Sequence, residues 1–179
     1  LKSLIKYCDD EDDKCKFLLK QAWIFKEKLD NPRKAIDIFN EVLDIRPSQI
    51  EVFQGIISML QAQKDFMAIE ANFERMIERQ RHVTPLNVKL MAVLCKNLGE
   101  LRLKQLNNIR GAAQAYKIVS ELYPDNVNFH VILAKLYAMN DDQLADAVHE
   151  NREILRLAPD KLDAVTDLAK CYRRMQQFD

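Results

Sequence analysis

Glycine and proline are scarce in this sequence, with three and five copies among 179 residues, and tryptophan occurs once. Together with a hydrophobic content of 48%, this scarcity is typical of an ordered chain that tolerates helices, and it argues against disorder. Net charge is also absent, because 27 basic residues balance 27 acidic ones. A neutral chain lacks the overall electrostatic attraction to a nucleic acid or an anionic membrane, so neither is favoured as a partner.

Metal-binding, redox and membrane signals are missing as well. No two of the four cysteines stand two residues apart, which excludes the spacing of a zinc knuckle or a redox dithiol and predicts free thiols at Cys8, Cys15, Cys95 and Cys171. No apolar run approaches the ~20 residues that span a bilayer. Residues 1–7 lack the basic region, apolar core and cleavage site of a signal peptide. We therefore expect a cytoplasmic protein without membrane insertion.

Catalytic motifs are not found in the chain either. The histidines lie far apart, at His82, His130 and His149, and no zinc-protease, dinucleotide or phosphate-loop motif occurs. His130 is expected to be a packed side chain. The acidic run 9–13 lacks the alternating ligands, glycine and distant glutamate of a calcium loop, so a turn with a helix N-cap is the better interpretation. We predict no enzyme, with no catalytic residue, cofactor or metal site.

The chain repeats itself. Residues 28–47 align with 105–124, so that Ala35 and Phe39 meet Ala112 and Tyr116, and a third copy ends at residues 147–159. Equivalent helix positions follow one another at intervals of 35, 42, 35 and 35 residues, from Leu18 through Phe53, Cys95 and His130 to Val165. This interval is typical of helical repeats, and the longer step indicates an insertion at about residues 78–87.

Each repeat resolves into two helices, because apolar residues recur three and four apart on both sides of a short polar break. The pattern predicts helices near 1–8, 13–29, 32–45, 49–63, 66–80, 85–106, 109–122, 126–139, 142–157 and 161–176. Residues of the types that cap helices precede several of these segments. The expected caps are Asn31, Ser48, Thr84, Asn108, Asp125 and Asp160.

The insertion has two interpretations. Thr84 and Pro85 are a suitable cap and first helical residue, so an unusually long helix is expected to begin there. A long helix with a projecting end would make a docking knob. The simpler interpretation, which we favour, is a tolerated difference in loop length.

The repeating slots resemble those of the tetratricopeptide repeat family, in which an aromatic or leucine position, a small residue, an Ala-x3-Phe pair and a closing proline recur. Here Ala22, Ala35, Phe39 and Pro47 fill the slots of the first complete repeat, and Gly99, Ala112, Tyr116 and Pro124 those of the third. The second and fourth repeats match less completely. Arg81 replaces the proline of the second, and Asn151 replaces the second aromatic of the fourth.

This resemblance implies an all-α fold, a right-handed superhelical solenoid of antiparallel helix pairs with Phe39, Phe73, Tyr116 and Tyr137 buried. A single solenoid over residues 1–179 would comprise units at about 1–12 (partial), 15–47, 50–81, 92–124, 127–159 and 162–179 (partial). Because capping helices are missing from both ends, we interpret the chain as a fragment of a longer array whose uncapped ends favour self-association.

In this family the inner faces of the first helices line a concave groove that binds other proteins. The resemblance thus implies a non-catalytic scaffold that binds a partner peptide or domain. The Lys/Asn clamp by which relatives hold the terminal carboxylate of heat-shock chaperones is interrupted by Glu100 and Ile132, so that ligand is not expected. The candidate groove contacts are Lys16, Leu19, Trp23, Gln54, Ser58, Lys96, Glu100, Asn128, Lys135, Lys170 and Arg173.

Three alternatives stay open at this point. A related pentatricopeptide repeat would read RNA one base at a time, although the Gly and Pro-Asp signals of that family are incomplete here and the net charge is zero. The segment would also suit the interaction arm of a larger enzyme. Trp23 is either a groove anchor or a buried core residue, and burial is favoured because large indoles are mostly covered.

Overall fold

The computed structural model describes residues 10–176, and every regular element in that range is helical. The helix expected at 1–8 lies outside the described residues. A short 3-10 helix, η1, covers Asp141–Gln143. The α-helices are α2 (Glu11–Glu27), α3 (Pro32–Ile45), α4 (Ile50–Ala62), α5 (Phe66–Arg81), α6 (Val88–Lys104), α7 (Ile109–Leu122), α8 (Val127–Ala138), α9 (Leu144–Leu157) and α10 (Leu162–Met175).

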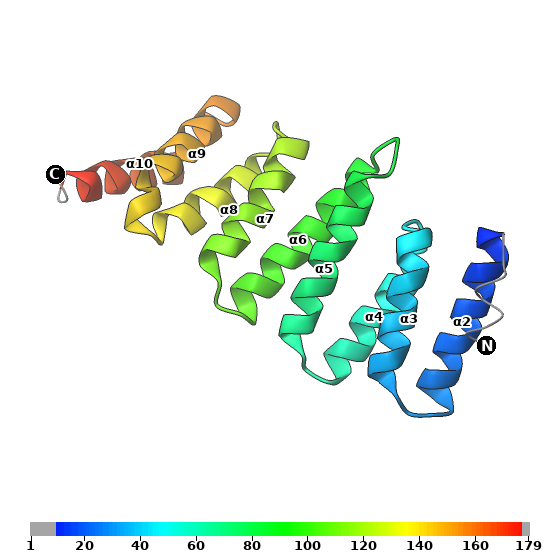
Figure 1. The fold of residues 1–179 in the computed structure, drawn as a ribbon. Coiled ribbons are helices and arrows are strands. Elements are labelled where there is room, and N and C mark those ends of the chain that lie inside the picture. Colours follow the sequence, from blue (N-terminus) through cyan, green and yellow to red (C-terminus); the bar gives the residue numbers. More distant parts are fainter. Residues whose placement is uncertain (1–9, 177–179) are drawn as a thin grey trace. The chain divides into compact units, whose positions relative to one another are not determined.

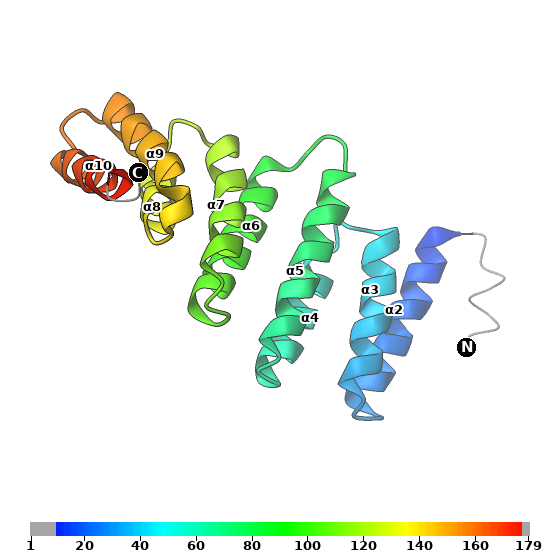
Figure 2. The same cartoon turned by 60° about the vertical axis from the view of Figure 1, so that its left-hand side comes forward.

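The helices divide into two compact halves, an N-terminal half that ends at Asn87 and a C-terminal half that begins at Val88. Within each half, helices that follow one another in the sequence pack together. Figures 1 and 2 show α2 and α3 side by side and antiparallel, and the same holds for α6 with α7 and α8 with α9. The predicted alternation of paired helices is confirmed for these elements, and the single solenoid over 1–179 stays a prediction.

Side-chain caps begin several of the helices. The carboxamide of Asn31 accepts a hydrogen bond from the backbone N–H of Lys34 at 3.1 Å, and that of Asn108 accepts one from Gly111 at 2.8 Å. Both predicted caps are confirmed. Asp10, within the acidic run, accepts from the N–H of Asp12 at 3.0 Å and so caps α2. Asp65 caps α5 in the same way and was missed by the sequence analysis.

Three expected caps are wrong by one residue, and the cause is the same each time. Helices α4, α8 and α10 are preceded by Gln49, Asn126 and Lys161 rather than by Ser48, Asp125 and Asp160. A β-turn closes at each of these residues, with N–H to C=O bonds from Gln49 to Arg46, from Asn126 to Tyr123 and from Lys161 to Ala158 at 3.0–3.2 Å. Proline occupies the second position of each turn, so the Ser or Asp that follows is used inside the turn.

The long helix expected from Thr84 is also wrong. Helix α6 begins at Val88, and its 17 residues equal the length of α2. Asparagine is a better N-cap type than threonine, and Asn87 directly precedes the observed helix. An earlier start would bury nothing, since Leu86 and Val88 are exposed and Met91 is the first buried residue of α6. Without burial, an extra helical turn gains little stability.

Burial in the structure confirms the small and aromatic positions predicted for the core. Ala22, Ala35, Ala112 and Ala147 are completely buried, and so allow paired helices to approach closely. The four aromatic residues expected in the core, Phe39, Phe73, Tyr116 and Tyr137, are all buried. At Gly99 the approach of α6 to α7 leaves no room for a side chain, because a Cβ atom there would lie 2.7 Å from the ring of Tyr116.

A polar network joins α3 to α5 in the N-terminal half. The guanidinium of Arg79, whose side chain is 9% exposed, donates to Asp44 Oδ1 from Nε at 2.8 Å and from Nη2 at 2.6 Å. Nη2 also donates to the backbone and side-chain oxygens of Asn40, each at 3.0 Å. Asn40 in turn donates to Asn72 Oδ1 at 2.9 Å. The network ties a buried cation to an acidic partner that is partly exposed.

His130 is buried in the C-terminal half, as expected, and bridges two helices and a loop. Its Nδ1 lies 2.7 Å from Glu150 Oε2 and its Nε2 lies 2.9 Å from the carbonyl oxygen of Pro124. A carboxylate and a carbonyl oxygen both accept hydrogen bonds, so the imidazolium form of His130, with a proton on each ring nitrogen, can donate to both. Burial alone would lower the pKa of His130, but the bonds to Glu150 and Pro124 and the charges of Glu150 and Glu153 raise it overall.

This geometry predicts a pH-dependent stability. A raised pKa in the folded chain means that the stabilisation is complete below the unfolded value of about 6.5 and is lost as pH rises through the folded value. Between about pH 6 and 9, the free energy of unfolding by urea should fall by about 1 kcal/mol more in the natural chain than in His130→Gln. His82→Gln is the matched control, because the His82 side chain is 78% exposed. Parallel pH profiles for the natural chain and His130→Gln would contradict the prediction.

Three of the four cysteines lie in the described range. Cys15 on α2, Cys95 on α6 and Cys171 on α10 are thiols and not disulfides, as predicted, and all three are buried, whereas Cys8 lies outside that range. Burial raises the pKa of the Cys15 and Cys171 thiols. The structure therefore holds these side chains as small apolar groups.

Candidate binding groove

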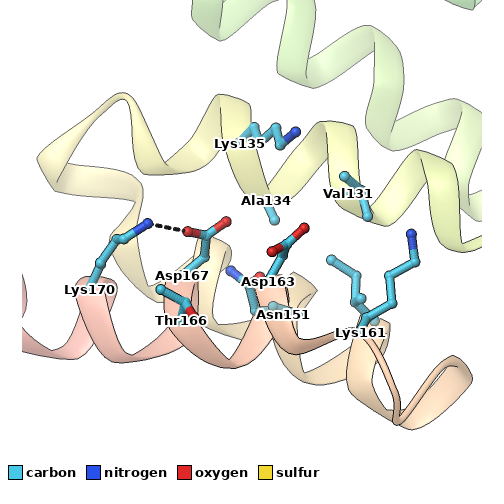
Figure 3. A pocket seen from close by; sticks show the side chains of 11 residues that line it. Val131, Ala134, Lys135, Asn151, Lys161, Asp163, Thr166, Asp167 and Lys170 are labelled. Carbon is cyan, nitrogen blue, oxygen red and sulfur yellow. Dashed lines mark hydrogen bonds and ion pairs between the residues drawn. The ribbon is translucent and has the colours of Figure 1, made fainter.

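A hollow lies between α8 and α10 in the C-terminal half, and α9 forms part of its floor. Small and apolar residues make the floor, where Ala134, Ile154 and Ala164 form one buried cluster. Charged side chains of α8 and α10 line the walls of the hollow. Figure 3 shows Lys135 on α8 opposite α10, from which Asp163 and Asp167 point toward α8.

The hollow has two adjoining parts of different character. The first, of about 190 Å³, extends along the beginning of α10 past Lys161 and Asp163. The second, of about 420 Å³, extends toward the ends of both helices, past Met139 and Arg173. Lys135 and Lys170 line both parts. We call the second part the basic end.

The predicted groove contacts fall on the first helices of the repeats. Helix α2 carries Lys16, Leu19 and Trp23, helix α4 carries Gln54 and Ser58, and helix α6 carries Lys96 and Glu100. Helix α8 carries Asn128 and Lys135, and α10 carries Lys170 and Arg173. Leu19 and Glu100 are half-buried and the other nine are exposed. The hollow brings together Lys135, Lys170 and Arg173, and the other eight do not line it.

Some lysines among the predicted contacts form ion pairs and one does not. Lys96 lies 3.9 Å from Glu100, which also pairs with Lys104 at 2.9 Å, and Lys170 pairs with Asp167 at 2.8 Å. Lys16 pairs with Asp13 at 2.8 Å, and this hydrogen bond raises the pKa of Lys16. Over residues 10–176, Lys135 makes no ion pair. Of the repeating lysines Lys96, Lys135 and Lys170, Lys135 is therefore the one without an ion pair in that range.

Trp23 is half-exposed, so the preferred expectation that it is buried is wrong. Its side chain is 50% exposed, its ring lies edge-on to Phe39 with centroids 6.0 Å apart, and the amine of Lys26 lies 4.5 Å from its centroid. The packed slots of α2 are already filled by Cys15, Leu18 and Ala22. Trp23 lies outside that stripe, so half of its surface stays exposed.

Several residues that line the hollow were missed by the sequence analysis. Lys161, Asp167 and Arg174 line it together with the predicted residues. Asp167 lies three residues before Lys170, and Arg174 lies four residues after it, so both are neighbours of this predicted contact on the same helix face. A wider stripe of candidate contacts along α10 would have included Asp167 and Arg174.

The described residues carry neither a metal cluster nor a membrane-spanning helix. Among the residues that the structure describes, no three His, Cys, Asp or Glu side chains come together in a way that could hold a metal ion. In the same range, no helix has the length and apolar character needed to cross a bilayer.

The paired helices and the hollow are typical of a helical-repeat protein, in which one face of each first helix is open to solvent. Residues 17–48 match the family model of the tetratricopeptide repeat. No curated protein sequence matches the chain. The crystal structure of YrrB, a tetratricopeptide repeat protein described as having an unusual peptide-binding site, superposes with a TM-score of 0.52 at 14% identity, over 89% of this chain and 76% of that one.

Two further structures are similar at lower TM-scores. The hetero-tetramer Cut9-Hcn1 of the APC/C gives 0.49 at 18% identity, over 86% of this chain and 29% of that one. MamA from Desulfovibrio magneticus RS-1 gives 0.47 at 14% identity, over 92% and 93%. Residues 17–48 thus match one tetratricopeptide repeat, and the likeness to YrrB confirms the predicted all-α helical-repeat fold.

Proposed function

We propose that the chain is a scaffold that binds a segment of another protein along the inner faces of its first helices. The observation that carries this proposal is the hollow between α8 and α10, which has a small apolar floor and charged walls. Such a combination suits a ligand that buries an apolar side chain and orients itself by a few polar contacts. The fold supports the proposal, since YrrB, which shares it, is described as having a peptide-binding site.

A displayed peptide library tests the proposal directly. Random 12-residue peptides, joined to their carrier at both ends so that no terminus is free, would be selected on the immobilised chain. Enriched sequences would then be synthesised and titrated against the chain by fluorescence anisotropy. Enrichment of related sequences with saturable binding supports a peptide scaffold. A selection that enriches nothing above background, repeated with independent libraries, would contradict it.

Trp23 is the predicted anchor in the N-terminal half. With half of its indole exposed, the side chain is available to a ligand, and tryptophan is enriched among residues that dominate interface energies. For a class of selected peptides, Trp23→Ala should raise Kd by about 30-fold, which corresponds to about 2 kcal/mol, with little change in thermal stability.

The neighbouring Ile24 supplies the control. Its side chain is 43% exposed and it points to another side of α2, so Ile24→Ala should leave peptide binding unchanged. If every selected peptide bound Trp23→Ala as tightly as the natural chain, and the variant melted at a lower temperature, Trp23 would be a packing residue and not an anchor.

A further inference from the structure

The charges at the basic end do not cancel. Within the described residues 10–176, four basic side chains and one carboxylate line it, namely Lys135, Lys170, Arg173, Arg174 and Asp167. Lys170 is paired with Asp167 at 2.8 Å, and Arg174 is used within the fold, because it donates to the carbonyl oxygen of Ala138 at 2.5 Å and pairs with Asp141. Lys135 and Arg173 have no such partner between residues 10 and 176. Two unpaired cations thus face a hollow in a chain of zero net charge.

Apolar surface adjoins these cations. Ala134, Ala138 and Met139 of α8 line the basic end, and the Met139 side chain is 58% exposed. Methionine adapts its shape to the groups packed against it. An apolar side chain placed here would lose water-exposed area beside two groups that attract a carboxylate.

The other part of the hollow has the opposite preference. Asp163 lines it and makes no ion pair in the described part of the chain, while Lys161 stands at the same end. An unpaired carboxylate disfavours a second one nearby. The hollow therefore distinguishes its two ends, and a ligand carboxylate is favoured at the end that holds Arg173.

A nucleic acid fits these features poorly. Among residues 10–176, no aromatic side chain lines either part of the hollow, so this part of the chain offers no ring on which a base could stack. Two unpaired cations are also few for a phosphate backbone, whose binding rests on many such contacts. A short peptide with localised charge matches the hollow better.

We infer that the basic end binds a peptide segment in which an acidic residue stands next to an apolar one, with the carboxylate between Lys135 and Arg173 and the apolar side chain against Met139. The inference rests on the proposed function and names the partner chemistry for this hollow. The carboxylate belongs to a side chain, so the ligand does not need a free C-terminus.

The sequences of the selected peptides give the first test of this inference. We expect a class of enriched sequences that share an Asp or Glu beside a Leu, Ile, Met or Phe. A synthetic member, acetylated and amidated, should bind at least about fivefold more tightly than its Asn or Gln isostere, and the difference should shrink as salt rises. If library peptides bind without any acidic preference, this inference is overturned while the proposed function stands. If no peptide is enriched, both fail.

Variants of the chain locate the site. Lys135→Gln and Arg173→Gln should each weaken binding of the acidic peptide by at least about fivefold, whereas Asp163→Asn should strengthen it by about twofold. Lys117→Gln, an exposed lysine on α7 outside the hollow, is the matched control for lost charge. Circular dichroism would confirm that each variant folds. Equal losses for Lys117→Gln and Arg173→Gln would overturn the inference, and so would single-stranded RNA that displaces the peptide at comparable concentration.

Discussion

Replacing Gly99 by alanine should lower the free energy of unfolding by about 2 kcal/mol, although alanine is the better helix former. The added Cβ would lie 2.7 and 2.8 Å from two ring carbons of Tyr116, which is closer than unbonded carbons approach. Tyr116 is 4% exposed, so its ring cannot turn away without disturbing the core. Urea denaturation followed by circular dichroism would measure the loss.

The same substitution at Gly55 should have the opposite sign. Gly55 lies in the middle of α4, and a Cβ added there would meet nothing within 4 Å. Gly55→Ala should therefore stabilise the chain by up to about 1 kcal/mol through helix propensity alone. The penalty at Gly99 should shrink when Tyr116→Leu removes the ring, as a double-mutant cycle would show. Equal effects at Gly55 and Gly99 would contradict the close contact of α6 with α7.

Asp44→Ala should destabilise the N-terminal half by about 2 kcal/mol, because it leaves the buried guanidinium of Arg79 with neutral acceptors only. The full cost of breaking a buried pair is larger, but the Asp44 side chain is 53% exposed and part of the interaction is screened by water. Urea denaturation would again give the value. Asp37→Ala, which removes an exposed carboxylate from the same helix, should change stability little.

Arg79→Met separates the charge from the packing. This substitution removes the cation together with its buried Nη1, which has no hydrogen-bond partner among the described residues. Asp44 then keeps water and Arg75, whose Nη2 lies 3.6 Å away. We expect a loss of less than about 1 kcal/mol, smaller than that of Asp44→Ala. A larger loss for Arg79→Met would show that the network itself stabilises the contact between α3 and α5.

Helix pairing was predictable from sequence because packing repeats every 35 residues. A completely buried alanine such as Ala35 or Ala112 tolerates no larger side chain, so the small slots are visible as a pattern. Helix starts were less predictable. The residue after each closing proline has the chemistry of a cap, and only the β-turn hydrogen bonds reveal that Ser48, Asp125 and Asp160 belong to the turn.

The candidate hollow between α8 and α10 was predictable in part. Lys135, Lys170 and Arg173 follow from helix faces, since their positions repeat on successive first helices. Which of these cations remains unpaired does not follow, because ion pairs depend on side-chain conformations that spacing alone leaves open. The exposure of Trp23 was missed for a related reason. Average burial of tryptophan is a property of the residue type, whereas here the stripe of α2 that packs was already filled.

The buried thiols give the chain native reporters of local opening. A thiol is alkylated as its thiolate and only when the reagent reaches it, so burial and a raised pKa both protect Cys15 and Cys171 while their helices stay packed. Modification then requires the surrounding helix to open, and its rate measures the free energy of that opening. With Cys95 included, α2, α6 and α10 each carry one such group. The order in which these three helices loosen can thus be followed by the mass that alkylation adds to each cysteine, without substituting any residue.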